Sequence, residues 1–580
     1  MSATVPVVAV RGSTGICLNY GPPGYDLVTG FTKDDSKYCK TMVFSPDGKY
    51  FAWINGSKVK IVSTSTWKIQ AEIQRPKVSN IDFSPKGTFF VTWEPFTGGQ
   101  PNQPGNPNLH IWKSETGELV RAFVHKKQIG WEPQWTRDEK ICARLLNNDV
   151  LFYENCNFEG SVHKLNIAKV ASFSLSPGSS PSYVLCHLPG NPGQPSFGRL
   201  FQYPKFDGTS SLANKSFFQA DKVDMFWNNR GMEVLLMTST DVDKTGASYY
   251  GKQTLHFIST KGETAMVMLG KEGPVYSVQW SPKSLEFCVV YGFMPAKATL
   301  FNLKCEPIFH FGEGIKNSVE YNPFGNILIF GGFGNLRGTI ELWDATNRKI
   351  ISKVDAPDTT LLRWSPDGEH FMTATTAPRL REGNGFKIWH YSGSLLYERP
   401  WNKQEELWEV SWQTFPPNTF KEPVISFKTV EGIQPSHPQA SKQAYRPPSA
   451  RGKDNFRVHE GDDHGIGRQD SVSKNALKLK KKREAKKAKK EQVSDGVSST
   501  QNQNHTSNHY LGVTSTNGLV ESDVTEDPEK LKKIKKIRSK LNEIAKLKNQ
   551  QAAGRQLELN QVEKIKKEEE LTKELNGLVL

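Results

Sequence analysis

Six cationic side chains stand in glycine-marked segments in the second half of the first 430 residues. They are Lys244, Lys252, Lys297, Arg337, Arg379 and Arg381. Four aromatic residues lie near them in the sequence, namely Tyr249, Tyr250, Phe293 and Phe333. Proteins hold single-stranded RNA with cations that attract phosphate and with aromatic rings that stack on bases. We therefore predict an RNA-binding surface, and the alternative is that these segments are simply polar surface loops.

A second group of cations follows near the end of the chain. Residues 474–490 hold ten cations and one acid and have almost no apolar face. Such a run orders on a polyanion, so we predict that it contacts RNA; a solvated charge run or a nuclear-import-like patch is the alternative. The cations assigned to this contact are Lys478, Lys480, Lys481, Lys482, Arg483, Lys486, Lys487, Lys489 and Lys490, and on a later helix Lys532, Lys533, Lys535 and Lys536.

Residues 246–253, Gly-Ala-Ser-Tyr-Tyr-Gly-Lys-Gln, match a nucleotide-binding loop except at the last position. Gln253 replaces the serine or threonine that binds Mg²⁺, and the segment joins two predicted strands instead of opening a helix. Asp243-Lys-Thr-Gly246 matches only four residues of the phosphorylation loop of cation-pumping ATPases. The sequence contains no HExxH, zinc-type Cys/His spacing or nucleophile elbow. We predict no catalytic residue, cofactor or metal, and no enzyme.

The elements that must position these residues follow a repeat. Nine times an aromatic or large apolar residue ends a short alternating run and enters a polar or Gly/Pro-marked turn. These residues are Phe44, Phe83, Trp135, Leu175, Trp227, Trp280, Tyr321, Trp364 and Trp412. A recurrence of roughly 40 to 50 residues with strands and turns is typical of propeller blades. We predict an all-β, WD-repeat-like propeller of nine blades; the weaker third and fourth repeats leave seven or eight as the alternative.

Closure of the ring is predicted from a mismatch in strand number. Third strands such as Leu109-His-Ile-Trp112 occur eight times, against nine inner strands. Two further strands, residues 7–10 and 16–20, precede the first repeat. Because an unpaired sheet edge invites aggregation, we predict that they complete the blade of Trp412; an open solenoid is the alternative. The six cations fall between second and third strands, so their loops should project from one face.

Composition changes after residue 430. Residues 1–430 carry 45 basic and 39 acidic side chains, whereas residues 431–580 carry 30 and 21 and only three aromatic residues. Most of that tail has too little apolar surface to form a core. The predicted parts are a propeller over 1–430, a disordered linker over 431–473, a polybasic helix-prone segment over 474–492, a second disordered linker over 493–525 and a basic amphipathic helical pair over 526–580.

Seven widely spaced cysteines without a CxxC pair indicate buried, reduced thiols and a reducing compartment. The N-terminus has no basic segment followed by an apolar stretch, and no run approaches the length of a membrane span. We therefore predict a cytoplasmic protein with no membrane partner.

Several segments of the sequence are specific enough to indicate a family. They are Asn214-Lys-Ser-Phe-Phe-Gln-Ala-Asp-Lys222, Ser239-Thr-Asp-Val-Asp-Lys-Thr-Gly-Ala-Ser-Tyr-Tyr-Gly251, Tyr291-Gly-Phe-Met-Pro-Ala-Lys-Ala-Thr299, residues 331–338, Ala377-Pro-Arg-Leu-Arg381 and Ala444-Tyr-Arg-Pro-Pro448. The blade pattern does not require runs of this length at loop positions. Together these segments resemble the eukaryotic translation initiation factor 2A family over essentially the entire chain.

The resemblance implies a non-enzymatic initiation factor that binds RNA. Such a factor binds the small ribosomal subunit and promotes codon-dependent, GTP-independent binding of initiator methionyl-tRNA for a subset of messenger RNAs. We expect other initiation factors as partners of the C-terminal helices. The alternative is a propeller protein–protein scaffold with a nonspecific RNA-binding basic tail. The family supplies no site residues, so those named above rest on position and charge.

Overall fold

Each repeat folds into antiparallel strands because its apolar residues alternate with polar ones. In the first repeat the strands β3 (Cys39–Phe44), β4 (Tyr50–Asn55), β5 (Lys58–Ser63) and β6 (Ile69–Ile73) pair in sequence order. The structure is a computed structural model. It describes residues 4–98, 105–167, 169–178, 180–191, 193–206, 211–218, 220–240 and 251–436, and further residues 537, 541, 544, 545, 548, 565, 568, 569 and 571–573.

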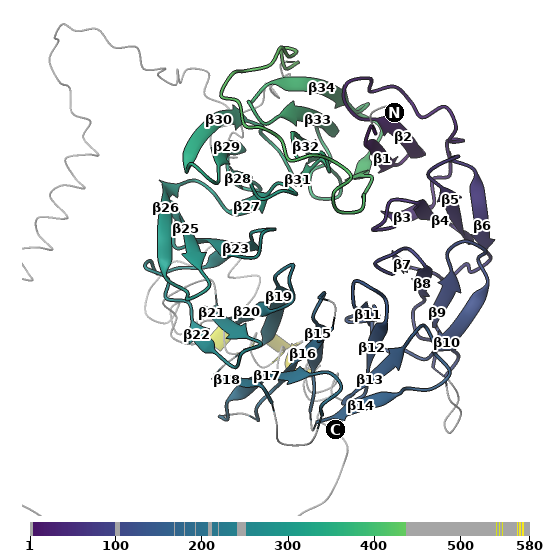
Figure 1. Cartoon of the computed structure of the whole chain (residues 1–580), viewed down its shortest axis with the longest axis vertical. Coiled ribbons are helices and arrows are strands. Elements are labelled where there is room, and N and C mark those ends of the chain that lie inside the picture. Colours follow the sequence, from purple (N-terminus) through teal and green to yellow (C-terminus); the bar gives the residue numbers. More distant parts are fainter. Residues whose placement is uncertain are drawn as a thin grey trace, which may run out of the picture. The chain divides into compact units, whose positions relative to one another are not determined.

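Eight four-stranded sheets and one three-stranded sheet form a ring of nine blades (Figure 1). We number the blades in chain order from the sheet β3–β6, and within each blade the strands run from the centre of the ring outwards. Blade 2 contains β7 (Asn80–Phe83), β8 (Phe89–Trp93), β9 (Leu109–Lys113) and β10 (Leu119–Phe123), and blade 3 contains β11 (Gln134–Trp135), β12 (Ile141–Leu146), β13 (Asp149–Glu154) and β14 (His163–Asn166). Blade 4 contains β15 (Ser172–Leu175), β16 (Tyr183–Leu188), β17 (Ser196–Gln202) and β18 (Ala213–Phe217), and blade 5 contains β19 (Lys222–Trp227), β20 (Glu233–Ser239), β21 (Gln253–Ser259) and β22 (Thr264–Met266).

Blades 6 to 9 continue the same order. Blade 6 contains β23 (Val275–Trp280), β24 (Glu286–Tyr291), β25 (Ala296–Asn302) and β26 (Pro307–Gly314), and blade 7 contains β27 (Ser318–Tyr321), β28 (Ile327–Gly331), β29 (Thr339–Asp344) and β30 (Lys349–Asp355). Blade 8 contains β31 (Leu361–Trp364), β32 (His370–Thr375), β33 (Gly385–His390) and β34 (Leu395–Pro400). Blade 9 contains β35 (Leu407–Trp412), β1 (Val7–Gly12) and β2 (Gly15–Tyr20). The nine-bladed propeller predicted from the sequence is confirmed.

The N-terminal strands close the ring. Strand β1 pairs antiparallel with β35, with Val8 opposite Trp412 and Val10 opposite Val410, and β2 pairs with the other edge of β1. The backbone N–H of Gln413 donates to the carbonyl of Val7 at 2.7 Å and extends this ladder by one residue. Figure 1 shows the purple N-terminal strands beside the last, green blade. The predicted closure is confirmed, and the open solenoid is excluded.

Blade 9 has no fourth strand, and the segment from 21 to 38 lies along its outer edge instead. Ile16 and Asp34 exchange two backbone hydrogen bonds, of 2.8 and 3.1 Å. The carboxylate of Asp34 is buried and accepts hydrogen bonds from Trp53 Nε1 at 2.8 Å and Lys60 Nζ at 2.9 Å. Because Trp53 and Lys60 belong to blade 1, Asp34 ties the closing blade to the first one.

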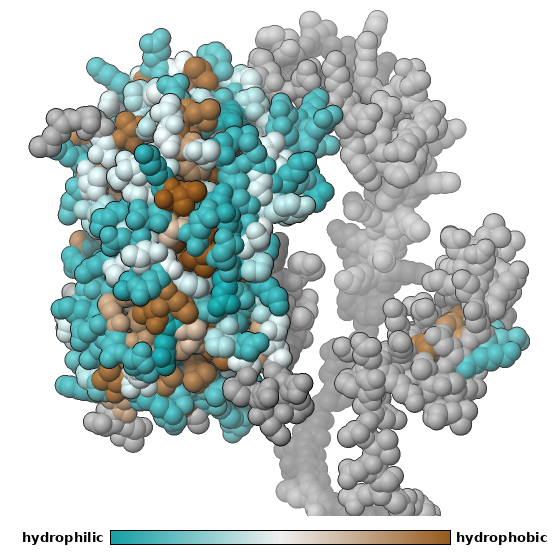
Figure 2. Space-filling view, turned by 90° about the vertical axis from the view of Figure 1, so that its right-hand side faces the viewer, coloured by the Kyte–Doolittle hydropathy of each residue, from teal (hydrophilic) through white to brown (hydrophobic). Residues whose placement is uncertain are grey.

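Antiparallel order gives the ring two faces. The turn face, as we define it, holds the connections between first and second strands and between third and fourth strands. The loop face holds the connections between second and third strands and from each outer strand to the next blade. Figure 2 shows the rim between the faces on the side of β6 and β10, where hydrophobic groups stand scattered among hydrophilic ones; Ile69 and Leu119 are 54% and 46% exposed there.

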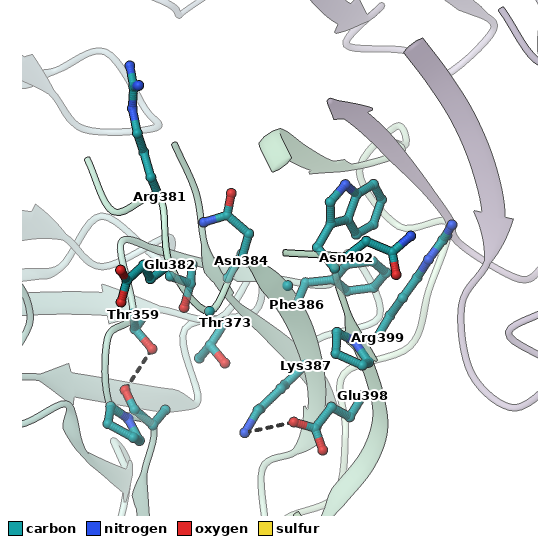
Figure 3. Close-up of a pocket in the computed structure, with 18 of the residues that line it drawn as sticks. Thr359, Thr373, Arg381, Glu382, Asn384, Phe386, Lys387, Glu398, Arg399 and Asn402 are labelled. Atoms are coloured by element: carbon teal, nitrogen blue, oxygen red, sulfur yellow. Dashed lines mark hydrogen bonds and ion pairs between the residues drawn. The ribbon is translucent and has the colours of Figure 1, made fainter. Parts of the chain in front are cut away.

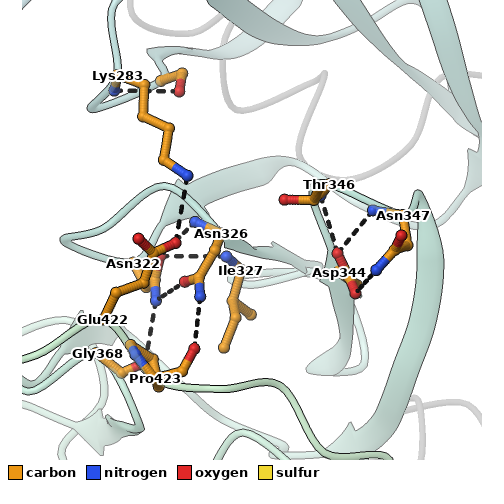
Figure 4. A network of polar contacts seen from close by, with 11 residues as sticks. Lys283, Asn322, Asn326, Ile327, Asp344, Thr346, Asn347, Gly368, Glu422 and Pro423 are labelled. Carbon is orange, nitrogen blue, oxygen red and sulfur yellow. Dashed lines mark hydrogen bonds and ion pairs between the residues drawn. The ribbon is translucent and has the colours of Figure 1, made fainter.

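After β35 the chain crosses the turn face as an irregular segment, residues 413–436, which we call the strap. At its start Gln413 Nε2 donates to the carbonyl of Gly48 at 3.1 Å. Further on, Asn326 Nδ2 of blade 7 donates to the carbonyl of Pro423 at 2.9 Å (Figure 4). The N–H of Ile433 finally donates to the carbonyl of Leu395 on β34 at 2.7 Å. The strap thereby spans several blades on one face and ends beside blade 8.

The boundaries predicted for the C-terminal parts are largely outside the described residues. The first six residues of the predicted linker, 431–436, are described and belong to the strap. The described residues between 537 and 573 are helical, with Ile537 and Ile544 buried and Lys548 paired with Glu568. The rest of the predicted helical pair, the polybasic segment and both linkers lie outside the described residues, so these domain assignments stay predictions.

Candidate nucleic-acid interface

The predicted propeller cations lie on the loop face wherever they are described. Lys252 immediately precedes β21, Arg337 lies between β28 and β29, and Arg379 and Arg381 lie between β32 and β33. Lys297 is the second residue of β25, so it stands just inside the strand and not in the loop. Lys244, Tyr249 and Tyr250 lie outside the described residues, as do the tail cations assigned between 478 and 490 and between 532 and 536.

The loops of blades 7 and 8 meet on this face. Gly334 has a φ of +79°, a conformation that glycine adopts without strain. A Cβ on Gly334 would stand 2.5 Å from Nη2 of Arg379, so the guanidinium lies directly against the backbone of the neighbouring loop. Arg337 is exposed in that same loop. The fold therefore brings cations from two blades into one area although 42 positions separate them in the sequence.

Lys297 stands beside the connection from blade 5 to blade 6. A Cβ on Gly270 would lie 3.9 Å from Lys297 Nζ. The next residue, Lys271, donates from Nζ to the carbonyl of Pro295 at 2.6 Å and pairs with Glu313 at 2.7 Å. Sequence reasoning missed Lys271 because it considered only loops between second and third strands. Antiparallel alternation places the connections between blades on the same face, and that signal was available.

Arg381 has a partner in the next blade. Its Nε lies 3.4 Å from Oε1 of Glu406, and the backbone N–H of Glu406 donates to Ser13 Oγ at 2.9 Å. This pair helps to fix the blade 8 loop against blade 9, and it neutralises part of the arginine charge. By contrast, no salt bridge within the described part of the chain involves Lys252, Lys297, Arg337 or Arg379. Their charges are therefore available to a ligand.

The two described aromatic candidates differ in exposure. Phe293 is 44% exposed, and its backbone N–H donates to the carbonyl of Glu272 at 2.9 Å. Phe333 is half-buried and packs on the core between blades 7 and 8, and Asn317 bonds both its N–H and its carbonyl at 3.0 and 2.9 Å. Further exposed apolar side chains of this face, missed by sequence reasoning, are Phe218, Met268, Met294 and Ile315.

A cleft of about 1060 Å³ opens beside Arg381 on blade 8, next to Ala356, Pro357 and Thr359 of the connection from blade 7 (Figure 3). The loop at 381–385 forms one wall, and residues 399–403 form another. In Figure 3 Glu382 and Asn384 stand apart from Asn402 and Arg399, and Arg381 points away from the others. At the bottom Lys387 Nζ pairs with Glu398 Oε1 at 3.1 Å. The cleft was not predicted, because its walls come from separate segments of the chain, residues 381–385 and 399–403 and the connection from blade 7.

Only the end of the nucleotide-loop-like motif, residues 251–253, lies within the described residues. Gln253 begins strand β21, and its Oε1 accepts a hydrogen bond from the backbone N–H of Val275 at 2.6 Å. The side chain that stands in place of the Mg²⁺-binding residue is therefore used to join blades 5 and 6. A nucleotide-binding loop is followed by a helix whose N-terminus binds phosphate, whereas a strand follows Lys252 here. The strand expected at this position is confirmed.

Several histidines and cysteines of the ring are buried, which favours their neutral forms. Burial lowers the pKa of His110, His256 and His390 to about 4 and raises the pKa of Cys39 and Cys186 to about 12. All seven cysteines are free, and Cys156 is exposed, so the prediction that every thiol is buried was wrong.

Among the described residues no group of three His, Cys, Asp or Glu side chains could hold a metal ion, and no helix is long and apolar enough to cross a membrane.

Comparison with known proteins decides the family. The family model "Eukaryotic translation initiation factor eIF2A" matches residues 215–410. The eukaryotic translation initiation factor 2A of Drosophila melanogaster is 44% identical over 461 residues, which cover 77% of this chain and 72% of the relative. The corresponding factor of Schizosaccharomyces pombe is 32% identical over 98% of both chains. The chain belongs to the eukaryotic translation initiation factor 2A family.

A solved structure supports the fold of this initiation factor 2A family member. A crystal structure described as that of the eukaryotic initiation factor aligns with a TM-score of 0.65 and 33% identity. The alignment covers 72% of this chain and all of the crystallised one. The family consists of translation initiation factors and not of enzymes, which agrees with the prediction from the residues.

Proposed function

We propose that this initiation factor binds the small ribosomal subunit through its loop face and its basic tail. In doing so it promotes codon-dependent, GTP-independent binding of initiator methionyl-tRNA on a subset of messenger RNAs in the cytoplasm. The observation that carries the proposal is a group of cations from successive blades that form no salt bridge within the described residues, namely Lys252, Lys297, Arg337 and Arg379. Membership of the initiation factor 2A family supports it independently.

Unpaired cations suit ribosomal RNA for an electrostatic reason. Each lysine or arginine that neutralises a phosphate releases counterions, which favours binding at low salt. Cations already bonded to carboxylates, such as Lys271 with Glu313, gain less from a new phosphate contact. Because Arg379 lies on the backbone at Gly334, two neighbouring loops present their charge together. GTP independence is supported by the use of Gln253 in blade packing.

Charge reversal tests the role of the loop face. We expect Arg337→Glu combined with Arg379→Glu to weaken association with the purified small ribosomal subunit roughly tenfold or more, since two phosphate contacts become repulsive. Both side chains are exposed, so the melting temperature should not change. The matched control is Lys261→Glu with Lys304→Glu, two exposed lysines on the turn face of blades 5 and 6. Equal losses of subunit binding in both variants would show that the attraction is general and that the loop face is not a specific binding surface.

The basic tail is tested by its salt dependence. Replacing the nine cations between Lys478 and Lys490 with glutamine should weaken subunit binding and flatten its salt dependence. Each lost phosphate contact removes about 0.9 units of slope on duplexes and about 0.7 on single strands. Thermal stability of the propeller should stay the same. An unchanged slope would make the run a solvated spacer.

A protein–protein scaffold is the second candidate function. Its specific support is the exposed apolar group on the loop face, with Phe218 and Met268 66% and 69% exposed. Replacing both with serine should leave binding to purified subunits unchanged if RNA is the ligand, but should abolish it if a ribosomal protein is. The predicted contact of the C-terminal helices with other initiation factors is tested separately. Residues 526–580 are deleted, and the binding of the shortened chain to those factors is measured.

A further inference from the structure

We propose that the cleft of blade 8 beside Arg381 binds one splayed nucleotide of single-stranded RNA. The inference rests on the proposed function, since it concerns RNA that has already reached the loop face. The cleft opens at the loop that carries Arg379 and Arg381 and has a volume of about 1060 Å³. A backbone bound by the neighbouring cations can therefore turn one base into it.

A stacked pair of side chains forms one wall. The guanidinium of Arg399 lies 4.8 Å from the centre of the Trp401 ring, and Arg399 Nη1 is fixed by a hydrogen bond to Asn19 Oδ1 at 2.9 Å. The backbone N–H of Trp401 donates to the backbone carbonyl of Asn384 at 2.8 Å, which ties the backbone at residue 401 to the loop at 381–385. Planar guanidinium and indole groups that are fixed in place are the surfaces on which unpaired bases stack.

Polar groups with free hydrogen-bonding capacity stand around this wall. Glu382, Asn402 and Lys403 are exposed, and in the described part of the chain their side chains have no hydrogen-bond partner or salt bridge. An amide offers both a donor and an acceptor to a base edge, and a carboxylate accepts from a base N–H. Lys403 supplies the charge for the adjoining phosphate.

Glu398 of the cleft and Glu406 beside it are already paired with cations, whereas Glu405 has no salt bridge among the described residues. Glu398 is paired with Lys387 and also accepts a hydrogen bond from the N–H of Ser436 at 2.8 Å. Glu406 is paired with Arg381. Glu405 also lines the cleft. A peptide would need a row of free backbone partners, whereas the free groups here are side chains gathered around one stacking surface. This arrangement favours a single nucleotide.

Site-resolved crosslinking of the full chain tests the proposal. The probe is a short unstructured RNA that contains 4-thiouridine, and crosslinked peptides are identified by mass spectrometry. We expect a crosslink within residues 399–403. Asn402→Ala with Lys403→Ala should reduce it about fivefold or more, because the pair removes one hydrogen-bonding amide and one phosphate-binding cation. Both residues are exposed, so melting should not change.

A tryptophan variant separates stacking from folding. Trp401→Phe keeps an aromatic surface and should retain most of the crosslink, whereas Trp401→Ala should lose it. Trp67→Ala, a half-buried tryptophan on the turn face, is the control and should leave the crosslink intact. Crosslinks at the loops of Arg337 and Arg379, without any at 399–403, would overturn the proposal that the cleft binds a nucleotide but would leave the proposed function standing. No crosslink on the loop face, with subunit binding unaffected by its charge reversal, would overturn both.

Discussion

The two faces of the ring are built from the same repeat but differ in what their polar groups do. On the turn face the first connection of a blade is a short turn whose side chains are used internally. Ser45 Oγ accepts the N–H of Tyr50, and Ser84 Oγ accepts the N–H of Phe89, both at 2.9 Å. On the loop face the corresponding connections differ in length and leave cations such as Arg337 unpaired.

The strap adds to this difference. On the turn face Lys283 pairs with Glu422 of the strap at 3.3 Å, and Lys49 pairs with Asp47 at 3.0 Å. A Cβ on Gly48, whose φ is +74°, would collide with the carbonyl of Thr414, so the strap approaches the turn closely. The comparison teaches that the loop face brings cations of neighbouring blades together at Arg337 and Arg379, whereas the strap lies across part of the turn face.

Opening the ring should have the largest effect on stability, because both faces depend on the closed ring of blades. Deletion of residues 1–20 leaves one edge of β35 unpaired and exposes Met372 and Ile388, which are buried in the same cluster as Val8 and Val10. We expect aggregation in light scattering and a large fall in the melting temperature. Unchanged solubility and melting would contradict the account of closure.

Asp34 tests an internal anchor on the loop-face side. Asp34→Ala leaves Lys60 and Trp53 without their buried partner, so we expect a loss of about 3–5 kcal/mol in the free energy of unfolding. Burial raises the pKa of Asp34, but hydrogen bonds from Lys60 and Trp53 outweigh it and the pKa is lowered. The stability that this carboxylate provides is therefore present at neutral pH and lost as pH falls through the lowered pKa.

Chemical denaturation at neutral and acid pH measures this contribution. The control is Asp35→Ala, which removes a carboxylate 75% exposed and paired only with an exposed lysine, and should change stability by less than about 0.5 kcal/mol. Equal effects of the two substitutions would show that the tie between blades 9 and 1 is unimportant.

Glu320 tests the inner wall that lies between the two faces. Burial raises the pKa of Glu320 to about 7, and the charge of Arg363, 3.5 Å away, lowers it only in part. Because the carboxyl has a higher pKa in the folded state than its usual 4.5, its contribution to stability is complete below that value and is lost as pH rises through 7.

Glu320→Gln removes this titration. The free energy of unfolding of the variant, minus that of the natural chain, should rise by about 1–3 kcal/mol between acid pH and slightly alkaline pH. Urea denaturation over that range measures the difference. A difference that does not vary with pH would show that the carboxyl titrates at its ordinary value.

Tyr391 tests the strap with a smaller expected effect. Its hydroxyl donates to the carbonyl of Val424 at 3.2 Å and accepts the N–H of Ser426 at 2.9 Å. Tyr391→Phe should cost about 1 kcal/mol of stability and make the strap more sensitive to protease. Subunit binding should not change, because the loop face is untouched. Tyr397→Phe, whose hydroxyl has no hydrogen bond in the described residues, is the control; equal proteolysis of both would contradict the tie.

The repeated parts of the fold were predictable from sequence, and the unique parts were not. Nine turn signals from Phe44 to Trp412 predicted nine blades, because each blade repeats the same alternation and turn chemistry. The missing third strand also predicted closure by residues 7–20. The strap has no period and is held by scattered partners such as Asn326, so no local pattern signals it.

The candidate site was predictable only in outline. Topology placed Arg337 and Arg379 on one face, but their juxtaposition depends on loop conformation at Gly334. Burial of Phe333 against blade 8 and pairing of Arg381 with Glu406 depend on neighbouring blades. Residues that contact each other across two blades are far apart in the sequence, so the pattern of a single repeat does not predict these contacts.

A cryo-electron-microscopy structure of the full chain bound to the small ribosomal subunit tests the central claim most directly. The account predicts that the loop face of blades 5 to 8 lies against ribosomal RNA, with Arg337 and Arg379 within contact distance of phosphates and the strap facing away. Ribosomal RNA seated on the turn face, with those two arginines in solvent, would contradict it.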